Sequence, residues 1–311
     1  MAVLVSIYCM AYNHEKYIRN ALEGFVNQVT DFEYEIIVHD DASTDSTAAI
    51  ILEYAEKYPQ IIIPVIQKEN QYSRGVNIFK EFIFPQMSGK YIAVCEGDDY
   101  WCDNYKLQKQ VDFLERHKKF IGCVHDSTVI NSLDGSKTLF SKKKRAGTVS
   151  MREIINWGCV FHTASLVYRR YIWEGESLKT VNGIGDYPFA LQLRLNGKIY
   201  FMKEPMAVYR ANTEGSWSRR NQERDENEKA MIIILEEFDR FSHRKYTKLV
   251  KNKIDALKIQ IYYRNKQIEK LKQIGSLHIA RVGYGKLAIS IFLQKRCNRI
   301  FPFLRSLVKK F

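Results

Sequence analysis

Four short apolar runs alternate with helical patterns in the first 117 residues and constrain the fold more than any other feature. The runs contain few polar residues, as expected of strands that are buried on both faces. Strands that alternate with helices predict an α/β fold, with a mostly parallel, Rossmann-like sheet covered by helices. The predicted strands are residues 3–9, 34–38, 61–66 and 91–95, and the predicted helices are residues 15–27, 44–58, 77–87 and 105–117.

Charge divides the 311 residues into a near-neutral body and a basic C-terminal region. Residues 1–240 carry 30 Lys/Arg and 33 Asp/Glu, a balance of −3, whereas residues 241–311 carry 18 and 2, a balance of +16. Such asymmetry indicates that one end of the chain meets an anionic surface. We predict a body at 1–222, with halves at 1–104 and 105–222, and a basic helical extension at 223–311 with helices over 225–240 and 246–274.

Acidic residues follow two of the predicted strands. Asp40 and Asp41 come after the second run, and Glu96, Asp98 and Asp99 come after the fourth. The carboxyl ends of parallel strands meet at one edge of a sheet, where α/β proteins bind their ligands. Five carboxylates at that edge would repel one another without a cation. Hard oxygen ligands with room for substrate phosphates predict a site for Mn²⁺ or Mg²⁺.

Helix capping is the alternative explanation for part of this pattern. Ser43–Asp45 precede a predicted helix, and we interpret them as N-caps. Capping does not explain Glu96–Asp99, because the next predicted helix begins several residues later. No P-loop and no G-x-G-x-x-G motif follows the first strand, so the phosphate is not held in the way of those motifs.

The order and spacing of these motifs resemble those of a family 2 glycosyltransferase with the GT-A fold, of the type that builds bacterial surface polysaccharides. The motifs are the first strand through Asn13, the D-D-A-S-T-D stretch Asp40–Asp45, and the E-G-D-D-Y-W stretch Glu96–Trp101. The resemblance covers about residues 3–217. It implies a nucleotide-sugar donor, in particular a UDP-sugar, a divalent metal, and an inverting transfer to a hydroxyl group.

The resemblance also assigns the donor-binding residues. Ala11 and Tyr12 match the rim of the nucleotide pocket, and Asp41 matches the acid that accepts a hydrogen bond from the uracil N–H. Arg74 is a candidate partner for a phosphate or the base, and an ordinary surface arginine is an equal alternative.

The E-G-D-D-Y-W stretch Glu96–Trp101 resembles the metal-binding motif of the family, and we call it the metal motif. In it, Asp98 resembles the acid that contacts ribose or sugar. Asp99 resembles the metal ligand that bridges to the diphosphate. Glu96 stands where the family has the first aspartate of D-x-D, which is a departure from the pattern.

Catalysis needs one carboxylate that removes the proton of the acceptor hydroxyl. Asp186, after Gly185, resembles the acid of the family's E-D position and is the candidate general base; a helix cap is the alternative. Residues 157–167 are apolar and predict a strand at the floor of the acceptor site. His162 lies in this segment, and we interpret it as a structural residue.

The segment from Val208 to Ser218 resembles the closing Y-R-x-H-x-x-G-x-S motif of the family. Arg210 and Ser216–Ser218 are candidates to hold the diphosphate, and Trp217 is a candidate to stack on it. Asn212 occupies the position where many members of the family have a histidine that helps to hold the metal or the diphosphate. The amide oxygen of Asn212 would be a weaker metal ligand than that histidine.

Residues 287–311 alternate bulky apolar side chains with Lys and Arg. This pattern is typical of an interfacial helix on anionic lipid. Packing against the body or against a second subunit, in a homo-oligomer, is the rival. A membrane contact favours a glycan acceptor linked to polyprenyl diphosphate. Residues 1–11 lack the basic start of a signal peptide, and no run approaches the ~18 apolar residues of a spanning helix. We therefore expect a cytoplasmic protein, peripheral on the inner face of the membrane.

Two other classes of function remain open from the sequence. A nucleotidyltransferase shares the crevice and the metal site but normally carries a Gly-rich, basic phosphate loop after the first strand, and residues 10–14 lack one. A non-catalytic adaptor for membrane or nucleic acid would use the basic region and would not need Asp99 or Asp186. We expect no nucleic-acid partner.

Overall fold

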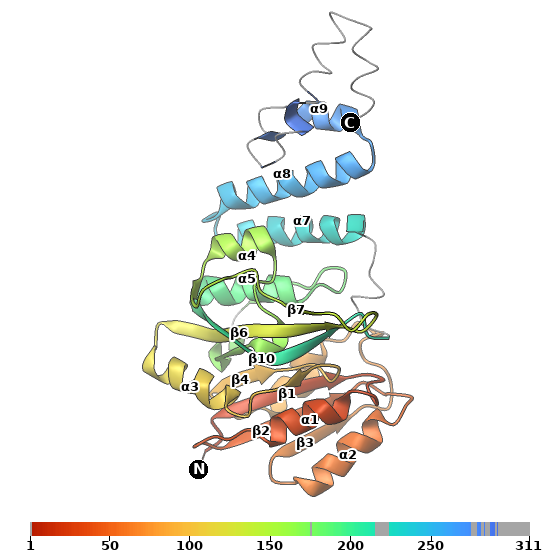
Figure 1. The fold of residues 1–311 in the computed structure, drawn as a ribbon, viewed down its shortest axis with the longest axis vertical. Helices are drawn as coiled ribbons and strands as arrows, with labels where there is room; N and C mark the ends of the chain where they lie inside the picture. The colour runs from red at the N-terminus through yellow and green to blue at the C-terminus, as the bar shows by residue number, and fades with distance from the viewer. Residues whose placement is uncertain are drawn as a thin grey trace, which may run out of the picture. The chain divides into compact units, whose positions relative to one another are not determined.

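The computed structural model describes residues 2–174, 176–214, 224–274, 279–280, 283, 287–289 and 291. The chain divides into two compact units. The first contains Met1–Ser177 and Phe189–Gln222, and the second contains Leu178–Pro188 and Glu223–Phe311. The expected α/β fold with a helical C-terminal part is present (Figure 1).

A ten-stranded mixed sheet forms the centre of the first unit, in the order β3-β2-β1-β4-β9-β6-β10-β5, with β7 added to β6 and β8 added to β10. The strands are β1 (Val5–Ala11), β2 (Tyr34–Asp40), β3 (Ile62–Ile66), β4 (Tyr91–Val94), β5 (Tyr100–Trp101), β6 (Phe120–Asn131), β7 (Lys137–Leu139), β8 (Gly147–Val149), β9 (Val167–Arg169) and β10 (Lys198–Ala211).

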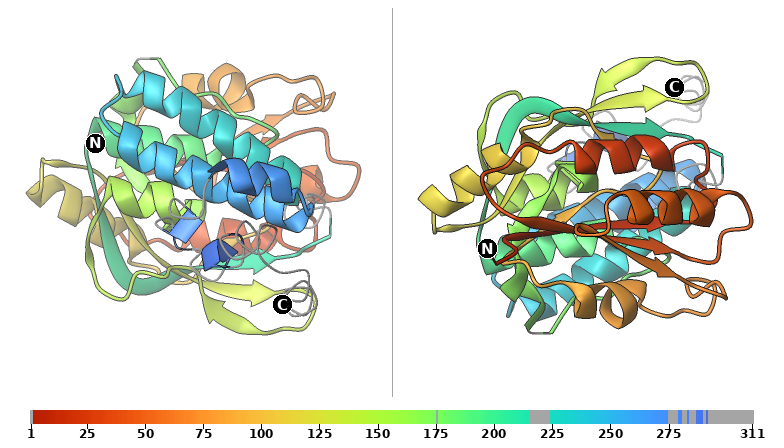
Figure 2. Two further views of the ribbon diagram at one scale, coloured as in Figure 1. Left: turned by 90° about the horizontal axis from the view of Figure 1, so that it is seen from above. Right: turned by 90° about the horizontal axis from the view of Figure 1, so that it is seen from below.

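The parallel part of the sheet consists of the four strands that the apolar runs predict. Helices α1 (Ile18–Val26) and α2 (Thr47–Lys57) pack with one face of these strands in the main core (Figure 2). Alternate residues point to the opposite face, where the ring of Tyr8 meets that of Phe79 at 5.1 Å between centroids. Phe79 begins the π-helical turn η1 (Phe79–Ile83), which continues into η2 (Phe84–Gln86) where a regular helix was predicted.

The other half of the sheet mixes parallel and antiparallel pairs. The long strands β6 and β10 pair in parallel, whereas β4 and β6 each pair antiparallel with β9. The predicted strand over residues 157–167 is wrong. Helix α4 (Met151–Trp157) ends at this point, the turn η3 (Thr163–Ser165) follows, and β9 begins only at Val167.

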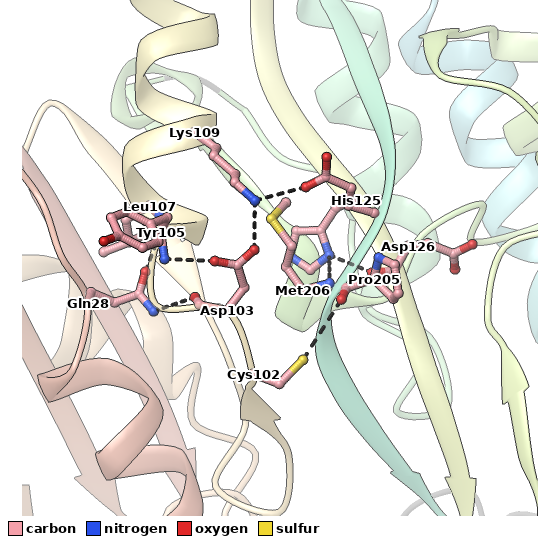
Figure 3. A network of polar contacts seen from close by, with 11 residues as sticks. Gln28, Cys102, Asp103, Tyr105, Leu107, Lys109, His125, Asp126, Pro205 and Met206 are labelled. Atoms are coloured by element: carbon pink, nitrogen blue, oxygen red, sulfur yellow. Dashed lines mark hydrogen bonds and ion pairs between the residues drawn. The ribbon is translucent and has the colours of Figure 1, made fainter.

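A polar network fixes the chain between β5 and helix α3 (Lys106–Arg116) (Figure 3). The side chain of Gln28 donates to the carbonyl of Asp103 at 2.9 Å and accepts from the N–H of Leu107 at 3.0 Å. Lys109 Nζ donates to Asp103 at 2.8 Å and to Glu204 of β10 at 2.9 Å. The segment that follows the E-G-D-D-Y-W motif is therefore tied to α1, α3 and β10.

The second unit contains the helices α7 (Arg224–Phe241), α8 (Thr247–Arg264) and α9 (Ile268–Ile274). The single helix predicted over residues 246–274 is therefore wrong, since Lys266 adopts a φ of 54° between α8 and α9. Arg264 of α8 pairs with Asp225 of α7 at 2.6 Å.

The predicted lipid-binding segment, residues 287–311, lies almost wholly outside the described residues. Of its described part, Ala288 and Ile291 are buried in a cluster with Ile259 and Leu271. No helix in the described part of the chain is both long enough and apolar enough to span a bilayer.

Candidate active site

The loops that follow β1 and β2 are joined by reciprocal hydrogen bonds. The N–H of Asn13 donates to Ser43 Oγ at 2.9 Å, and the N–H of Thr44 donates back to Asn13 Oδ1 at 2.8 Å. The N–H of Glu15 donates to Asp45 Oδ2 at 3.1 Å. The second oxygen of Asp45 accepts the N–H of Thr47 in the first turn of α2, as a cap does. Ser43 bonds to the first loop instead, so its assignment as a cap is wrong.

The carboxylates of Asp40 and Asp41 both accept hydrogen bonds from backbone N–H groups. Asp40 accepts the N–H of Ser43 at 3.0 Å. The oxygens of Asp41 accept the N–H groups of Gln71 at 2.8 Å and Tyr72 at 3.0 Å, from the loop after β3. Asp41 is also tied to the end of β1, because its N–H donates to the carbonyl of Ala11 at 3.0 Å. Asp40 and Asp41 therefore have hydrogen-bond partners within the chain, and the expected repulsion among five carboxylates is relieved for this pair without a cation.

The predicted nucleotide-binding residues lie at two neighbouring points of this edge. Ala11 is the buried last residue of β1, and Tyr12 after it is 43% exposed. Arg74 lies in the loop that Asp41 holds and pairs with Glu69 at 2.5 Å, with both side chains exposed. An exposed pair of this kind contributes little to stability.

The E-G-D-D turn packs closely against the end of β1. A Cβ atom on Gly97 would lie 2.9 Å from His14 Nδ1 and 3.1 Å from the Cβ of Ala11, so a larger residue here would force these side chains to shift. The N–H of Gly97 donates to the carbonyl of Met10 at 3.0 Å. Glu96 accepts a hydrogen bond from the hydroxyl of Thr163 at 3.1 Å. These contacts place the three acids of the turn beside the loop of β1.

Asp99 is almost fully buried, with 2% of its surface exposed. Its Oδ1 accepts the N–H of Arg210 at 2.8 Å. Burial, followed by repulsion from Asp98 and Glu96, raises the pKa of Asp99 well above its usual value. Asp98 is half-buried and accepts the hydroxyl of Thr213 at 3.2 Å. A cation beside these acids would relieve their repulsion.

The donor set fits a metal ion that takes its other ligands from a substrate. No three His, Cys, Asp or Glu side chains within the described ranges are arranged to hold an ion by themselves. Mg²⁺ and similar ions are commonly held by one or two carboxylates together with substrate phosphates. Asp99, with Asp98 beside it, could supply such a carboxylate.

Arg210 is held behind the metal motif. Its guanidinium donates to the carbonyl of Asp98 and to Asn20 Oδ1, both at 2.7 Å. The same group lies over the rings of Tyr100 and Tyr17, at 4.5 and 5.2 Å from their centroids. These contacts join β10 and α1 to the E-G-D-D turn. The guanidinium of Arg210 therefore donates to acceptors of the protein itself in this structure.

His162 lies next to the metal motif, which the sequence did not indicate. Its Nε2 is 3.5 Å from Asp99 Oδ2, and its ring stacks on Tyr209 at 4.3 Å between centroids. Its Nδ1 accepts the N–H of Ala164 at 3.3 Å, which agrees with a structural role. Burial lowers the pKa of His162 to about 3, so the ring is neutral at physiological pH.

Asp186 begins helix α5 (Asp186–Asn196) and accepts the N–H of Tyr187 at 2.8 Å. It belongs to the second unit, whereas the acidic turn belongs to the first, so its catalytic role stays a prediction. Asn212 donates to Asn131 Oδ1 at 3.0 Å. Ser216–Ser218, with Trp217, lie outside the described residues.

The mixed α/β sheet with its flanking helices has the GT-A fold. The family follows from the sequence comparison, in which residues 6–175 match the model of Glycosyl transferase family 2. The chain belongs to this family.

Two relatives are similar over different lengths of the chain. An uncharacterised protein of Mycobacterium tuberculosis is 39% identical over 214 residues, which cover 68% of this chain and 60% of the relative. The chain therefore spans less than two thirds of that relative's length. The Escherichia coli protein WfaP, named UDP-Glc:alpha-D-GlcNAc-diphosphoundecaprenol beta-1,3-glucosyltransferase, is 34% identical over 117 residues, which cover 38% of this chain and 43% of WfaP.

Two solved structures share the fold. Staphylococcus aureus TarS 1–349 in complex with UDP-GlcNAc aligns with a TM-score of 0.61 at 19% identity, covering 95% of this chain and 92% of that one. The mannosyltransferase PcManGT of Pyrobaculum calidifontis, in complex with GDP-Man and Mn²⁺, aligns with a TM-score of 0.53 at 15% identity, covering 99% and 84%.

Proposed function

We propose that the protein transfers a sugar from a UDP-sugar to a hydroxyl group of a glycan or lipid-linked acceptor, with a divalent metal and with inversion at the anomeric carbon. The observation that carries this proposal is the buried Asp99 beside Asp98 at the carboxyl edge of the sheet, where burial, followed by repulsion from Asp98 and Glu96, raises the Asp99 pKa. Such a pair favours a cation and the diphosphate that comes with it.

Asp99 is the proposed protein ligand of Mn²⁺ or Mg²⁺, and Asp98 is the proposed contact to ribose or sugar. The metal, when bound, supplies positive charge that stabilises the leaving diphosphate. Arg210 supports this role through its contacts to the carbonyl of Asp98 and to the carboxylate of Asp99. The Mn²⁺ complex of PcManGT supports a divalent ion for this fold.

The nucleotide is proposed to bind between the ends of β1 and β2. The exposed ring of Tyr12 is available to stack on a base. Each carboxylate oxygen of Asp41 has a second lone pair, so the acid can accept a uracil N–H while it holds the loop of Gln71 and Tyr72. Arg74 in the same loop is the proposed partner of a phosphate or the base.

Asp186 is the proposed general base, which accepts the proton of the acceptor hydroxyl as that oxygen attacks the anomeric carbon. The bond between the sugar and the diphosphate breaks on the opposite side, and the configuration inverts. This single displacement needs one carboxylate, whereas retaining glycoside hydrolysis uses two flanking carboxylates and a covalent intermediate.

The acceptor is proposed to be a glycan on polyprenyl diphosphate in bacterial surface-polysaccharide synthesis. The name of WfaP, which includes a diphosphoundecaprenol acceptor, supports this class. The basic C-terminal region is proposed to hold the enzyme on the cytoplasmic face of the membrane. Ala288 and Ile291 are buried and take no part in the proposed lipid contact, whereas Ile289 between them is 61% exposed.

A screen of nucleotide sugars tests the proposal. Purified protein is incubated with each sugar in Mn²⁺, in Mg²⁺ or in EDTA, and release of UDP and of pyrophosphate are both measured. We expect metal-dependent release of UDP from one or a few sugars. Pyrophosphate release from UTP with a sugar phosphate would identify a nucleotidyltransferase instead, and no release in any condition would favour the adaptor.

A further inference from the structure

The β6–β7 hairpin and the loop after it carry a cluster of exposed basic residues in the first unit. Residues 137–145 contain five Lys/Arg and no acid. Lys143 pairs with Glu153 at 2.7 Å. The side chains of Lys137, Lys142, Lys144 and Arg145 are exposed and have no ion-pair partner within the part of the chain that the structure describes.

The same hairpin exposes two leucines. Leu133 in its turn is 67% exposed and Leu139 at the end of β7 is 54% exposed. In both views of Figure 2, the yellow-green pair of strands extends outward from the rest of the sheet. Exposed apolar side chains beside unpaired cations match the two components of shallow binding to an anionic bilayer, which are insertion and attraction to headgroups. A soluble polyanion would need only the cations.

Local contacts hold this surface in place. Ser141 Oγ donates to the carbonyl of Val160 at 2.7 Å and accepts the N–H of Lys143 at 3.2 Å. Because Ser141 and Lys143 are fixed inward, Lys142 and Lys144 on either side of Lys143 are left to solvent. The cations are therefore presented by an ordered loop.

The hairpin is also joined to the wall of the active site. The ring of Phe140 lies 5.3 Å from that of His162, and His162 lies 3.5 Å from Asp99. The N–H of Ser132 donates to the carbonyl of Ala211 at 2.9 Å, one residue after Arg210. A bilayer that contacts the hairpin would lie near the metal motif.

We propose that the β6–β7 hairpin, through Leu133, Leu139, Lys142, Lys144 and Arg145, docks the catalytic unit on an anionic phospholipid bilayer. This surface is separate from the basic C-terminal region. Docking here brings the carboxyl edge of the sheet to the bilayer surface, where the diphosphate of a lipid-linked acceptor lies. The proposal concerns lipid binding alone, so it can hold or fail independently of the proposed transfer reaction.

Co-sedimentation with vesicles tests this proposal on the full chain. The patch variant is Lys142→Gln with Lys144→Gln and Arg145→Gln. A matched control removes three exposed lysines elsewhere in the first unit: Lys68→Gln, Lys119→Gln and Lys198→Gln. Vesicles contain phosphatidylcholine alone or equal parts of phosphatidylcholine and phosphatidylglycerol. Because each basic residue near an anionic surface contributes about a factor of five, we expect the patch variant to bind about a hundredfold more weakly than wild type at low salt.

A second variant, Leu133→Ser with Leu139→Ser, tests insertion. We expect it to lose the binding that persists at high salt, where electrostatic attraction is screened. Equal binding by the patch and control variants would overturn the proposal. Patch-dependent binding of soluble polyphosphate without binding to the mixed vesicles would also overturn it, because that result identifies a polyanion site. All substituted side chains are exposed, and a circular dichroism spectrum identical to wild type confirms that each variant folds.

Discussion

The backbone N–H of Arg210 donates to Oδ1 of Asp99 at 2.8 Å, while the guanidinium of Arg210 donates to the carbonyl of Asp98. One residue at the end of β10 thus holds two consecutive acids of the metal motif, which lie 111 and 112 positions earlier in the chain. This relationship makes Arg210 a positioning residue for the site.

Replacement of Arg210 by Lys separates positioning from charge. Lys keeps the positive charge but cannot make both contacts of the planar guanidinium to Asp98 and Asn20. We expect kcat to fall about a hundredfold, because small displacements of catalytic groups cost that much. Asn20→Ala, which removes only the acceptor on α1, should lower kcat in the same direction. Full activity in both variants would show that Arg210 acts as a simple charge.

The loop of residues 70–75 depends on Asp41. Asp41→Ala removes the acceptor of both the Gln71 and the Tyr72 N–H, and hydrogen bonds to a carboxylate contribute about 1.5–3 kcal/mol each. We expect these two amides to lose protection from hydrogen exchange in the absence of nucleotide, and KM for the donor to rise. Asp41→Asn, which retains one acceptor, should lose less protection. Unchanged protection in Asp41→Ala would show that other contacts hold the loop.

Asp186→Asn tests the general base. The amide cannot accept the proton of the acceptor hydroxyl, so we expect turnover to fall about 10²–10⁴-fold while donor affinity stays near wild type. The measurement is a steady-state rate together with donor binding by calorimetry. Near-normal turnover would assign Asp186 only the helix-start contact to Tyr187.

Lys106 gives a prediction for stability against pH. The side chain is fully buried on α3, its Nζ has no hydrogen-bond partner among the described residues, and it lies 3.9 Å from the centroid of the Trp101 ring. Burial lowers its pKa to about 7, although Cys95, Cys123 and Asp103 oppose the shift.

Between pH 7 and about 10.4, the unfolded chain binds this proton and the folded chain does not, so the free energy of unfolding rises with pH in this window. Below pH 7 Lys106 is protonated in both the folded and the unfolded chain. Its contribution to the free energy of unfolding is then independent of pH and is at its lowest value. Lys106→Met removes the titration, so we expect the variant to be more stable by about 1–3 kcal/mol at pH 7. Urea denaturation should show that this advantage shrinks toward pH 9.5. A constant difference would contradict the shifted pKa.

The sequence predicted the parallel half of the sheet well, because its strands are short apolar runs whose order along the chain fixes where the acids lie. It missed β6 and β10, since β10 is interrupted by Lys203, Glu204 and Pro205, where the pairing register shifts. It overread residues 157–167, where Gly158 adopts a φ of 78° and the apolar side chains enter turns.

The sequence indicates the candidate acids of the site but not their contacts. The acids and their order are visible in the motif, whereas their partners come from distant segments. Asp41 is bound by a loop 30 residues later, and Asp99 lies beside His162 and Arg210. No periodicity or local motif encodes such pairs, because they depend on which distant strands and loops meet in the folded sheet.

Calorimetric titration of UDP into the wild-type protein and into Asp99→Asn, each in Mn²⁺ and in EDTA, tests the central claim most directly, because it requires neither the sugar nor the acceptor to be known. Asn retains an oxygen that accepts the N–H of Arg210, so the variant should keep the fold of the turn. We predict tight binding only for wild type in Mn²⁺, with a large loss in EDTA and in Asp99→Asn. Equal affinity in all four titrations, or no binding by wild type, would contradict a metal-dependent UDP-sugar site.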